Sequence, residues 1–246
     1  MSDVESHYAK LLGEVFAWSV SAHGDPFARA SAWIEAHALG DADTYLDLGA
    51  GFGAHTLPLL RAGKRVTAVD MDPTLLGQLE ARLEEHAGRA SVHRGEMLEF
   101  LGGADERTWQ VILCLGDTLT HLPDHASVRA FLRAAWEHLT LGGRLALSYR
   151  DSTELVAEGC ARFVHVAADA QRTMHCLLEP IDEERLRVTD IVTEVGDEGP
   201  RTRLSDYTKV RIAPAMITAW GEEIGFQVGP PSMERGLVTE LLRKPG

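Results

Sequence analysis

The segment Asp47-Leu48-Gly49-Ala50-Gly51-Phe52-Gly53 is the part of the sequence whose residue types best suit ligand binding. Glycines allow a tight turn, let a ligand approach the backbone closely and can expose amides where a helix begins. The alternating pattern predicts a short buried strand over Thr44–Leu48 before this loop and a helix over Ala54–Ala62 after it. The loop also satisfies the Gly-x-Gly-x-x-Gly/Ala pattern of dinucleotide sites, so by itself it does not choose between cofactors.

Acidic side chains follow the next two predicted strands. Asp70 ends a strand over Arg65–Asp70, where a carboxylate can accept two hydrogen bonds from a ribose diol. Glu96 and Met97 come after a third strand, Ala90–Arg94, and are placed to meet an adenine edge and face. Because the carboxyl ends of parallel strands open into one crevice, we expect these residues to share a site with the glycine loop.

The fourth and fifth predicted strands, Gln110–Leu115 and Arg144–Tyr149, are followed by candidates for the chemistry itself. His121 could act as a base, or could cap a helix or pack in the core. Asp117 is expected to contact a ligand, because an unpaired buried carboxylate is costly. Tyr149 is expected at the crevice, and Arg150 could pair with a substrate carboxylate or with a neighbouring acid.

Residues distant in the sequence could complete this site. Tyr207, Lys209 and Arg211 alternate along one predicted strand and so share a face, although a solvated face is the default for such residues. Tyr8, Phe16 and Trp18 lie on predicted N-terminal helices and could cover the cofactor, or could simply pack against the sheet. A metal site at His121 and His125 is not expected, since Pro123 intervenes and no third ligand is near.

The elements that position these residues follow an α/β pattern. Helices are predicted over the first 40 residues, and from residue 43 strands alternate with helices, which indicates a doubly wound, mostly parallel sheet of seven strands. After Asp151 four strands follow with turns between them, which predicts an antiparallel β insertion. The predicted organisation is a helical lid (1–40), a cofactor domain (41–151 and 213–246) and inserted strands on the acceptor side (152–212). The inserted strands, the closing helix and the closing strands are expected over Phe163–Ala167, Thr173–Glu179, Arg185–Val195, Arg203–Ile212, Pro214–Ile224, Phe226–Val228 and Leu237–Leu242.

The composition of the chain indicates which classes of binding partner are favoured and which are disfavoured. The 246 residues carry a net charge of −13 without a sizeable basic patch, which disfavours nucleic acid and favours a small acceptor. No apolar run is long enough to span a membrane, and the acidic start lacks a signal-peptide pattern. Cys114, Cys160 and Cys176 form no Cys-x-x-Cys pair, which suits a reducing cytoplasm. The inserted strands could form an interface between two copies of the chain.

Taken together, these motifs resemble those of class I S-adenosylmethionine-dependent methyltransferases. Asp47 before the loop, with the third glycine one residue early, resembles motif I, and the resemblance continues through Asp70 and Gly95-Glu96-Met97 to Leu139–Leu145 and Glu222–Phe226. It implies S-adenosylmethionine as the cofactor and S-adenosylhomocysteine as the product. The residues it implies at the cofactor are Tyr8, Trp18, Asp47, Gly49, Ala50, Gly51, Asp70, Met71, Glu96, Met97, Leu115, Gly116 and Asp117.

The predicted reaction is an in-line methyl transfer to a nitrogen or oxygen of a small molecule, with His121, Tyr149 and Arg150 as candidate catalytic residues. Residues 114–124 resemble glycine N-methyltransferase-like enzymes, which usually have asparagine where this chain has Asp117. Such a reaction depends mainly on alignment and exclusion of water. Two alternatives remain at this point: a nicotinamide-dependent oxidoreductase using the same loop, and a non-catalytic S-adenosylmethionine-binding subunit.

Overall fold

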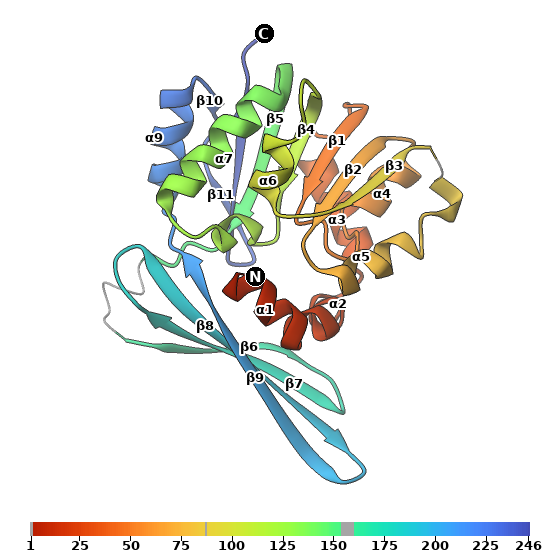
Figure 1. The fold of residues 1–246 in the computed structure, drawn as a ribbon, viewed down its shortest axis with the longest axis vertical. Coiled ribbons are helices and arrows are strands. Elements are labelled where there is room, and N and C mark those ends of the chain that lie inside the picture. The colour runs from red at the N-terminus through yellow and green to blue at the C-terminus, as the bar shows by residue number, and fades with distance from the viewer. Residues whose placement is uncertain (1, 87, 154–159) are drawn as a thin grey trace.

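The computed structural model describes residues 2–86, 88–153 and 160–246 (Figure 1). Over these ranges the chain forms a mostly parallel sheet with helices on both faces, and a separate antiparallel sheet of four strands. The predicted α/β fold with an antiparallel insertion is therefore confirmed. No helix in the described ranges combines the length and the apolar character that crossing a bilayer requires.

The central sheet has the strand order β10-β12-β5-β4-β1-β2-β3, with β12 antiparallel to both of its neighbours along this order. Its strands are β1 (Thr44–Leu48), β2 (Arg65–Asp70), β3 (Ala90–Arg94), β4 (Trp109–Cys114), β5 (Leu139–Tyr149), β10 (Gln227–Val228) and β12 (Leu237–Arg243). A short strand that the sequence did not predict, β11 (Ser232–Glu234), pairs with β12. The order reverses between β1 and β4, and a crevice opens at the carboxyl ends of strands at such a point.

Alternating side chains of the central strands supply two apolar cores. On one face Leu46, Leu48 and Ile112 pack against α6 (Met97–Gly102), α7 (His125–His138) and α9 (Pro214–Ile224). On the other face Tyr45 and Leu113 pack against α3 (Pro26–Ala36), α4 (Thr56–Arg61) and α5 (Pro73–Glu80). Both faces of the strands are buried, as expected for parallel strands covered by helices.

Side-chain caps fix where several helices begin. Asp72 accepts a hydrogen bond from the Leu75 amide at 2.8 Å, and Pro73 occupies the first turn of α5. The helix α4 is shorter than the predicted Ala54–Ala62, because the chain is still in a turn through residue 55. The short helix α6 was not predicted, although Glu96 caps its start.

The inserted sheet contains β6 (Arg162–Ala168), β7 (Arg172–Pro180), β8 (Arg185–Gly196) and β9 (Gly199–Val210), in that order and all antiparallel. The predicted insertion begins at residue 152, and its residues 154–159 lie outside the described part. Along β8 the residues Leu186, Val188, Asp190 and Val192 are buried at every second position. One face of this sheet is therefore turned toward the rest of the protein.

The N-terminal helices lie between the two sheets (Figure 1). They comprise α1 (Asp3–His7), a π-helical turn (Tyr8–Leu12) and α2 (Gly13–Ser21). Val4 packs with residues of β8 and β9, whereas Leu11 packs with residues of β7 and β8. π-Helical turns are rare and often lie at functional sites. The segment thus forms a wall shared by the central sheet and the insertion.

Candidate active site

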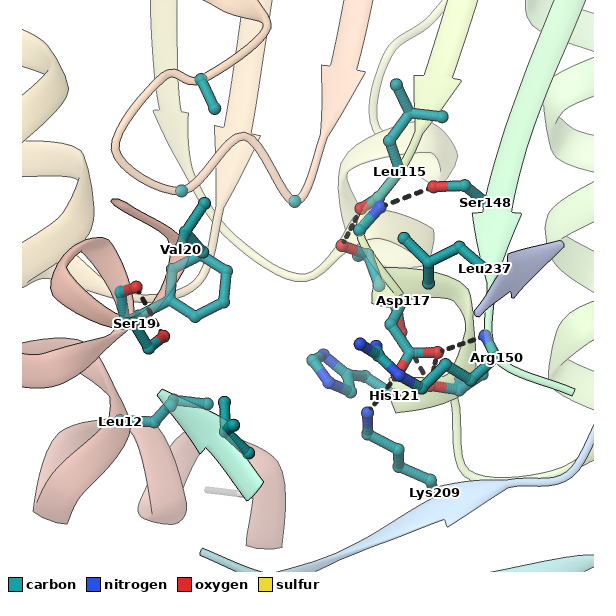
Figure 2. Close-up of a pocket in the computed structure, with 18 of the residues that line it drawn as sticks. Leu12, Ser19, Val20, Leu115, Asp117, His121, Ser148, Arg150, Lys209 and Leu237 are labelled. Carbon is teal, nitrogen blue, oxygen red and sulfur yellow. Dashed lines mark hydrogen bonds and ion pairs between the residues drawn. The ribbon is translucent and has the colours of Figure 1, made fainter. Parts of the chain in front are cut away.

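A single cavity of about 1280 Å³ runs from the glycine loop to the inner face of the inserted sheet. Pockets for one small ligand commonly measure roughly 300–1000 Å³, so this cavity has room for a cofactor and an acceptor together. Figure 2 shows Leu12, Ser19 and Val20 on one side of it and His121 and Lys209 facing them on the other. The end near the glycine loop is called the cofactor end below, and the end at β7, β8 and β9 the acceptor end.

The glycine loop is shaped for close approach. Gly49 and Gly51 have φ angles of +74° and +55°, which side chains rarely adopt. A Cβ on Gly49 would collide with the Thr118 side chain. The amides of Gly49 and Ala50 donate to the carbonyl oxygen of Val69, and that of Gly51 donates to Asp70. These three amides hold the loop to the end of β2 and are therefore not available to a ligand.

Asp47, in β1 directly before the loop, supports it. Its side chain is buried, and one carboxylate oxygen accepts a hydrogen bond from the Thr56 hydroxyl at 2.6 Å. Burial raises the pKa of Asp47 to about 6. Asp47 is absent from the cavity wall. Its predicted place among the cofactor contacts is corrected to a position between β1 and α4, where it holds the loop.

Asp70 lies in the wall of the cofactor end, at the place predicted for the ribose acid. Its two carboxylate oxygens accept bonds from the amides of Gly51 at 2.8 Å and Asp72 at 2.9 Å. Each oxygen keeps a second acceptor position, which a pair of ribose hydroxyls can use. Burial raises the pKa of Asp70 to about 6, and the two amides oppose that rise.

The predicted adenine contacts separate in the structure. Met71 and Met97 line the cofactor end together with Gly95. Glu96 instead accepts bonds from the amides of Leu98 at 2.7 Å and of the following residue, so its carboxylate caps α6. Glu96 is not part of the cavity wall, and both amides bond to one of its carboxylate oxygens, so its contact with an adenine edge stays a prediction.

The cofactor end fits S-adenosylmethionine. The turn at Gly49 and Gly51 leaves backbone without side chains at the wall, and the fixed carboxylate of Asp70 offers two acceptors beside it. Ala50, Met71, Met97, Leu115 and Gly116 also line this region. A nucleoside with a ribose diol and an apolar base would find complementary groups here.

Asp117 is at the centre of a charged cluster beyond the end of β4. Its carboxylate lies 2.5 Å from Lys209 Nζ and 3.6 Å from Arg150 Nη1, and it accepts a bond from the Arg150 amide at 2.9 Å (Figure 2). Burial acts to raise the pKa of Asp117, but Lys209 and Arg150 outweigh it and lower the pKa to about 2. Asp117 lines the cavity, yet its charge is already engaged by these two cations.

Three rings meet where the two ends of the cavity join. His121 lies edge-on to Tyr8 and to Tyr207, with centroid distances of 5.8 and 5.6 Å. In the described part of the chain neither phenol is hydrogen-bonded to the protein, and all three residues line the cavity. Burial, followed by the positive charge of Lys209, lowers the pKa of His121 to about 3. The ring is therefore neutral over the physiological range.

Two of the predicted site residues lie elsewhere. Tyr149 is fully buried in the core against β12, where its hydroxyl donates to Glu240 at 2.5 Å. The indole of Trp18 donates to Asp169 at 2.6 Å, and the Arg172 guanidinium lies over its ring. Both predictions are wrong, because Tyr149 points to the core face of β5 and Trp18 packs on the turn between β6 and β7.

Two residues in the wall of the acceptor end, Asp190 and Cys176, and the buried His7 that contacts Asp190 went unrecognised as site residues in the sequence. Asp190 in β8 is 1% exposed, and it is bonded to His7 Nε2 at 2.9 Å and to Cys176 Sγ at 2.6 Å. The signal available in the sequence was Asp190 itself, an acidic residue at a position of β8 where the alternating pattern otherwise has apolar residues. Arg211, in contrast, does not join Tyr207 and Lys209 at the cavity, since backbone carbonyls such as that of Ser152 surround its guanidinium.

Comparison with known proteins agrees with this geometry. Residues 46–143 match the family model of a methyltransferase domain. Over 188 residues the chain is 31% identical to a cypemycin N-terminal methyltransferase from a Streptomyces species, a match that covers 76% of this chain and 69% of that protein.

Solved structures share the fold. The CcbJ methyltransferase from Streptomyces caelestis has a TM-score of 0.81 and 19% identity, and the match covers 98% of this chain and 99% of that one. CalS10, an amino pentose methyltransferase from Micromonospora echinaspora solved with S-adenosylmethionine bound, has a TM-score of 0.74 and 19% identity, with coverages of 94% and 96%. The finer resemblance to glycine N-methyltransferases stays a prediction. The chain belongs to the class I S-adenosylmethionine-dependent methyltransferases, and its product from the cofactor is S-adenosylhomocysteine.

Proposed function

We propose that this enzyme methylates an amine nitrogen of a small molecule that binds at the acceptor end of the cavity. The observation that carries the proposal is the junction of the two ends, where Tyr8, Tyr207 and His121 present polar atoms without protein partners among the described residues. A nucleophile that reaches this junction from the acceptor end would face the cofactor end directly.

The groups at the junction favour nitrogen over oxygen. A hydroxyl must give up its proton to become a strong nucleophile, and this requires a base whose pKa lies near the working pH. His121 has a pKa of about 3, and burial raises the pKa values of both phenols well above their usual range, so none of these is such a base. A neutral amine already carries a reactive lone pair.

The residues of the site would then promote the reaction by positioning the cofactor and the amine. S-Adenosylmethionine supplies an electrophilic methyl group on a positively charged sulfur. The chain holds the ribose through Asp70, while the phenols of Tyr8 and Tyr207 donate hydrogen bonds and the neutral His121 ring offers an acceptor to the amine. Alignment of this kind, in a cavity lined on one side by the N-terminal helices, can account for much of a methyl transfer rate.

Two names among the relatives support an amine. The cypemycin enzyme is named for an N-terminal methylation, and CalS10 is described as acting on an amino pentose. The charge of the chain supports a small acceptor, because a net charge of −13 repels polyanions.

The test is a turnover screen with matched acceptors. The pure protein is incubated with S-adenosylmethionine and pairs of compounds that differ only in an amine or a hydroxyl, including amino sugars and short peptides. S-Adenosylhomocysteine formation and the added methyl mass are read by mass spectrometry. We expect acceptor-dependent turnover with amines and an amine product. Turnover confined to the hydroxyl members would refute nitrogen methylation, and Asp70→Asn serves as the cofactor-deficient control.

A further inference from the structure

Asp190 is a buried carboxylate in the wall of the acceptor end. It lies in the middle of β8, where its neighbours on the same face, Val188 and Val192, are apolar. The residue is 1% exposed and still contributes to the cavity surface. Cys176 lies directly opposite it on β7. An acid in so apolar a setting must be compensated if it is charged.

The side-chain partners of Asp190 are a cysteine and a histidine. Cys176 donates its thiol to one carboxylate oxygen, and this donor is neutral. His7 is fully buried and contacts the other oxygen through Nε2, while its Nδ1 is buried without a partner in the described structure. The side chains that contact this carboxylate are thus an imidazole and a thiol, and neither belongs to a lysine or an arginine.

No lysine or arginine of the described ranges lies within ion-pair distance of Asp190. Lys209, the ammonium of the same wall, is committed to Asp117 at 2.5 Å, and Arg150 also faces Asp117. Asp70 has no cation either, but it accepts two backbone amides at the cofactor end. Among the described residues of β7, β8 and β9 that line the cavity, Asp190 is thus the one carboxylate, and it has no lysine or arginine partner.

We propose that Asp190 binds a protonated amine of the acceptor and so makes the enzyme specific for organic cations with an apolar body. This inference rests on the proposed function in taking the acceptor end as the site of the methyl acceptor. Leu186 and Val188 flank the carboxylate with apolar surface, and the Tyr207 ring, stacked on His7 at 4.3 Å, adds an aromatic face. Cations bind favourably to such faces. The bound ammonium is either a second amine of the molecule or the reacting amine itself, which must release its proton to water before its nitrogen lone pair can attack the methyl group.

The experiment uses two probes that share a body and differ in charge. Binding of 2-phenylethylamine and of 2-phenylethanol is measured at pH 7 by calorimetry on protein saturated with S-adenosylhomocysteine. We expect the wild-type protein to bind the amine about tenfold more tightly than the alcohol, the scale of one charge-assisted hydrogen bond. Asp190→Asn should abolish this preference while leaving the affinity for the alcohol unchanged.

The matched control is Asp206→Asn. Asp206 is an exposed acid of the same inserted sheet that does not line the cavity, so its replacement removes the same charge and should keep the amine preference. An amine preference that survives Asp190→Asn, or that is absent from the wild-type protein, would overturn the proposal. If Asp190→Asn does not fold, nuclear Overhauser contacts from the amine probe to the Leu186 and Val188 methyl groups of the wild-type protein decide it. Contacts only to other residues would contradict the proposal.

A second titration tests whether the charge of Asp190 serves the sulfonium of the cofactor instead. S-Adenosylmethionine carries that positive charge and S-adenosylhomocysteine does not. We expect Asp190→Asn to leave the ratio of their dissociation constants unchanged. A selective loss of S-adenosylmethionine binding would assign the carboxylate to the cofactor and overturn the proposal.

The screen for turnover separates the two proposals. If the enzyme methylates only hydroxyls but its amine preference depends on Asp190, nitrogen methylation fails and the ammonium site stands. If amines are methylated and Asp190→Asn changes neither the KM for them nor probe binding, the ammonium site fails and nitrogen methylation stands.

Discussion

Asp70 joins the glycine loop to the cofactor end through a single carboxylate. Two backbone amides fix its orientation, and only its remaining acceptor positions face the cavity. A protonated carboxyl has one hydroxyl in place of an acceptor, so it can no longer accept both hydrogen bonds of a diol. Because burial raises the pKa of Asp70 to about 6, this loss falls within an accessible pH range.

We therefore predict that affinity for S-adenosylhomocysteine falls as the pH decreases from 7 to 5. The ionised form of Asp70 binds the diol, and it is depleted as the pH passes below about 6. Calorimetric titrations at half-unit pH steps measure the effect. Asp70→Asn should bind weakly at every pH and show no such slope. A slope that persists in this variant would point to another acid, of which Asp47, with its own pKa of about 6, is the first to test.

His121 should stay neutral in the folded protein. Burial and the nearby Lys209 lower its pKa to about 3, so its ring signals should not titrate between pH 5 and 8. The measurement is a proton–carbon correlation spectrum of the histidine rings over that range, with His121→Gln used to assign the peak. A midpoint near 6 would show that the ring can take up a proton during turnover, and would restore it as a candidate base.

At the scale of elements, the turn between β1 and α4 depends on backbone that only glycine adopts easily. Gly49 has a φ of +74° and lies against Thr118, whereas Gly77 within α5 has open space around it. We predict that Gly49→Ala lowers stability by about 1–2 kcal/mol from the backbone alone and impairs S-adenosylhomocysteine binding. Gly77→Ala, the matched control, should stabilise the helix by roughly 0.5–1 kcal/mol.

Urea unfolding and calorimetry of the two variants test this prediction. Equal effects of both substitutions on cofactor binding would mean that the loop tolerates a side chain at Gly49. The comparison separates the geometric requirement of the turn from the general preference of helices for alanine.

The sequence predicted most strands of the central sheet well, because β1, β4 and the end of β5 are buried on both faces and glycines follow several strands. It predicted side-chain direction poorly at the strand ends. Ser148 lines the cavity and its hydroxyl accepts a hydrogen bond from the Gly116 amide, whereas the next residue, Tyr149, faces the core. A shift by one residue along the strand therefore reverses which side chain is expected at the cavity. A strand that is apolar on both sides contains no signal for this choice.

Contacts between segments that are distant in the sequence were the second feature that the sequence did not predict. Trp18 pairs with Asp169 across the packing of α2 on the inserted sheet, and His7 meets Asp190 across 183 positions. No local sequence pattern indicates that the residues of such a pair are in contact. The buried acid in the apolar alternation of β8 could have marked Asp190, but its partners required the fold.

For the whole molecule, polar contacts join three parts of the fold around the cavity: the central sheet, the N-terminal helices and the inserted sheet. Asp117, after β4, binds Lys209 of the inserted sheet, and His7 of α1 binds Asp190 of the same sheet. Arg203 of β9 also pairs with Glu14 of α2 at 2.8 Å. The Asp117–Lys209 pair is the one that joins the central sheet to the insertion at the reaction site.

Replacing Lys209 alone should destabilise the protein more than replacing both Lys209 and Asp117. Lys209→Met leaves Asp117 buried with only Arg150 as a cation, and we predict a loss on the order of 3 kcal/mol in the free energy of unfolding at pH 7. Adding Asp117→Asn should recover much of this loss, because no unpaired charge then remains. The pKa of Asp117 falls from 3.8 to about 2 on folding, so its contribution is present above pH 4 and is lost as the pH falls toward 2. Urea unfolding of the wild type, Lys209→Met, Asp117→Asn and the double variant at pH 7 and pH 3 measures both effects, and additive losses at pH 7 would show that the two side chains act independently.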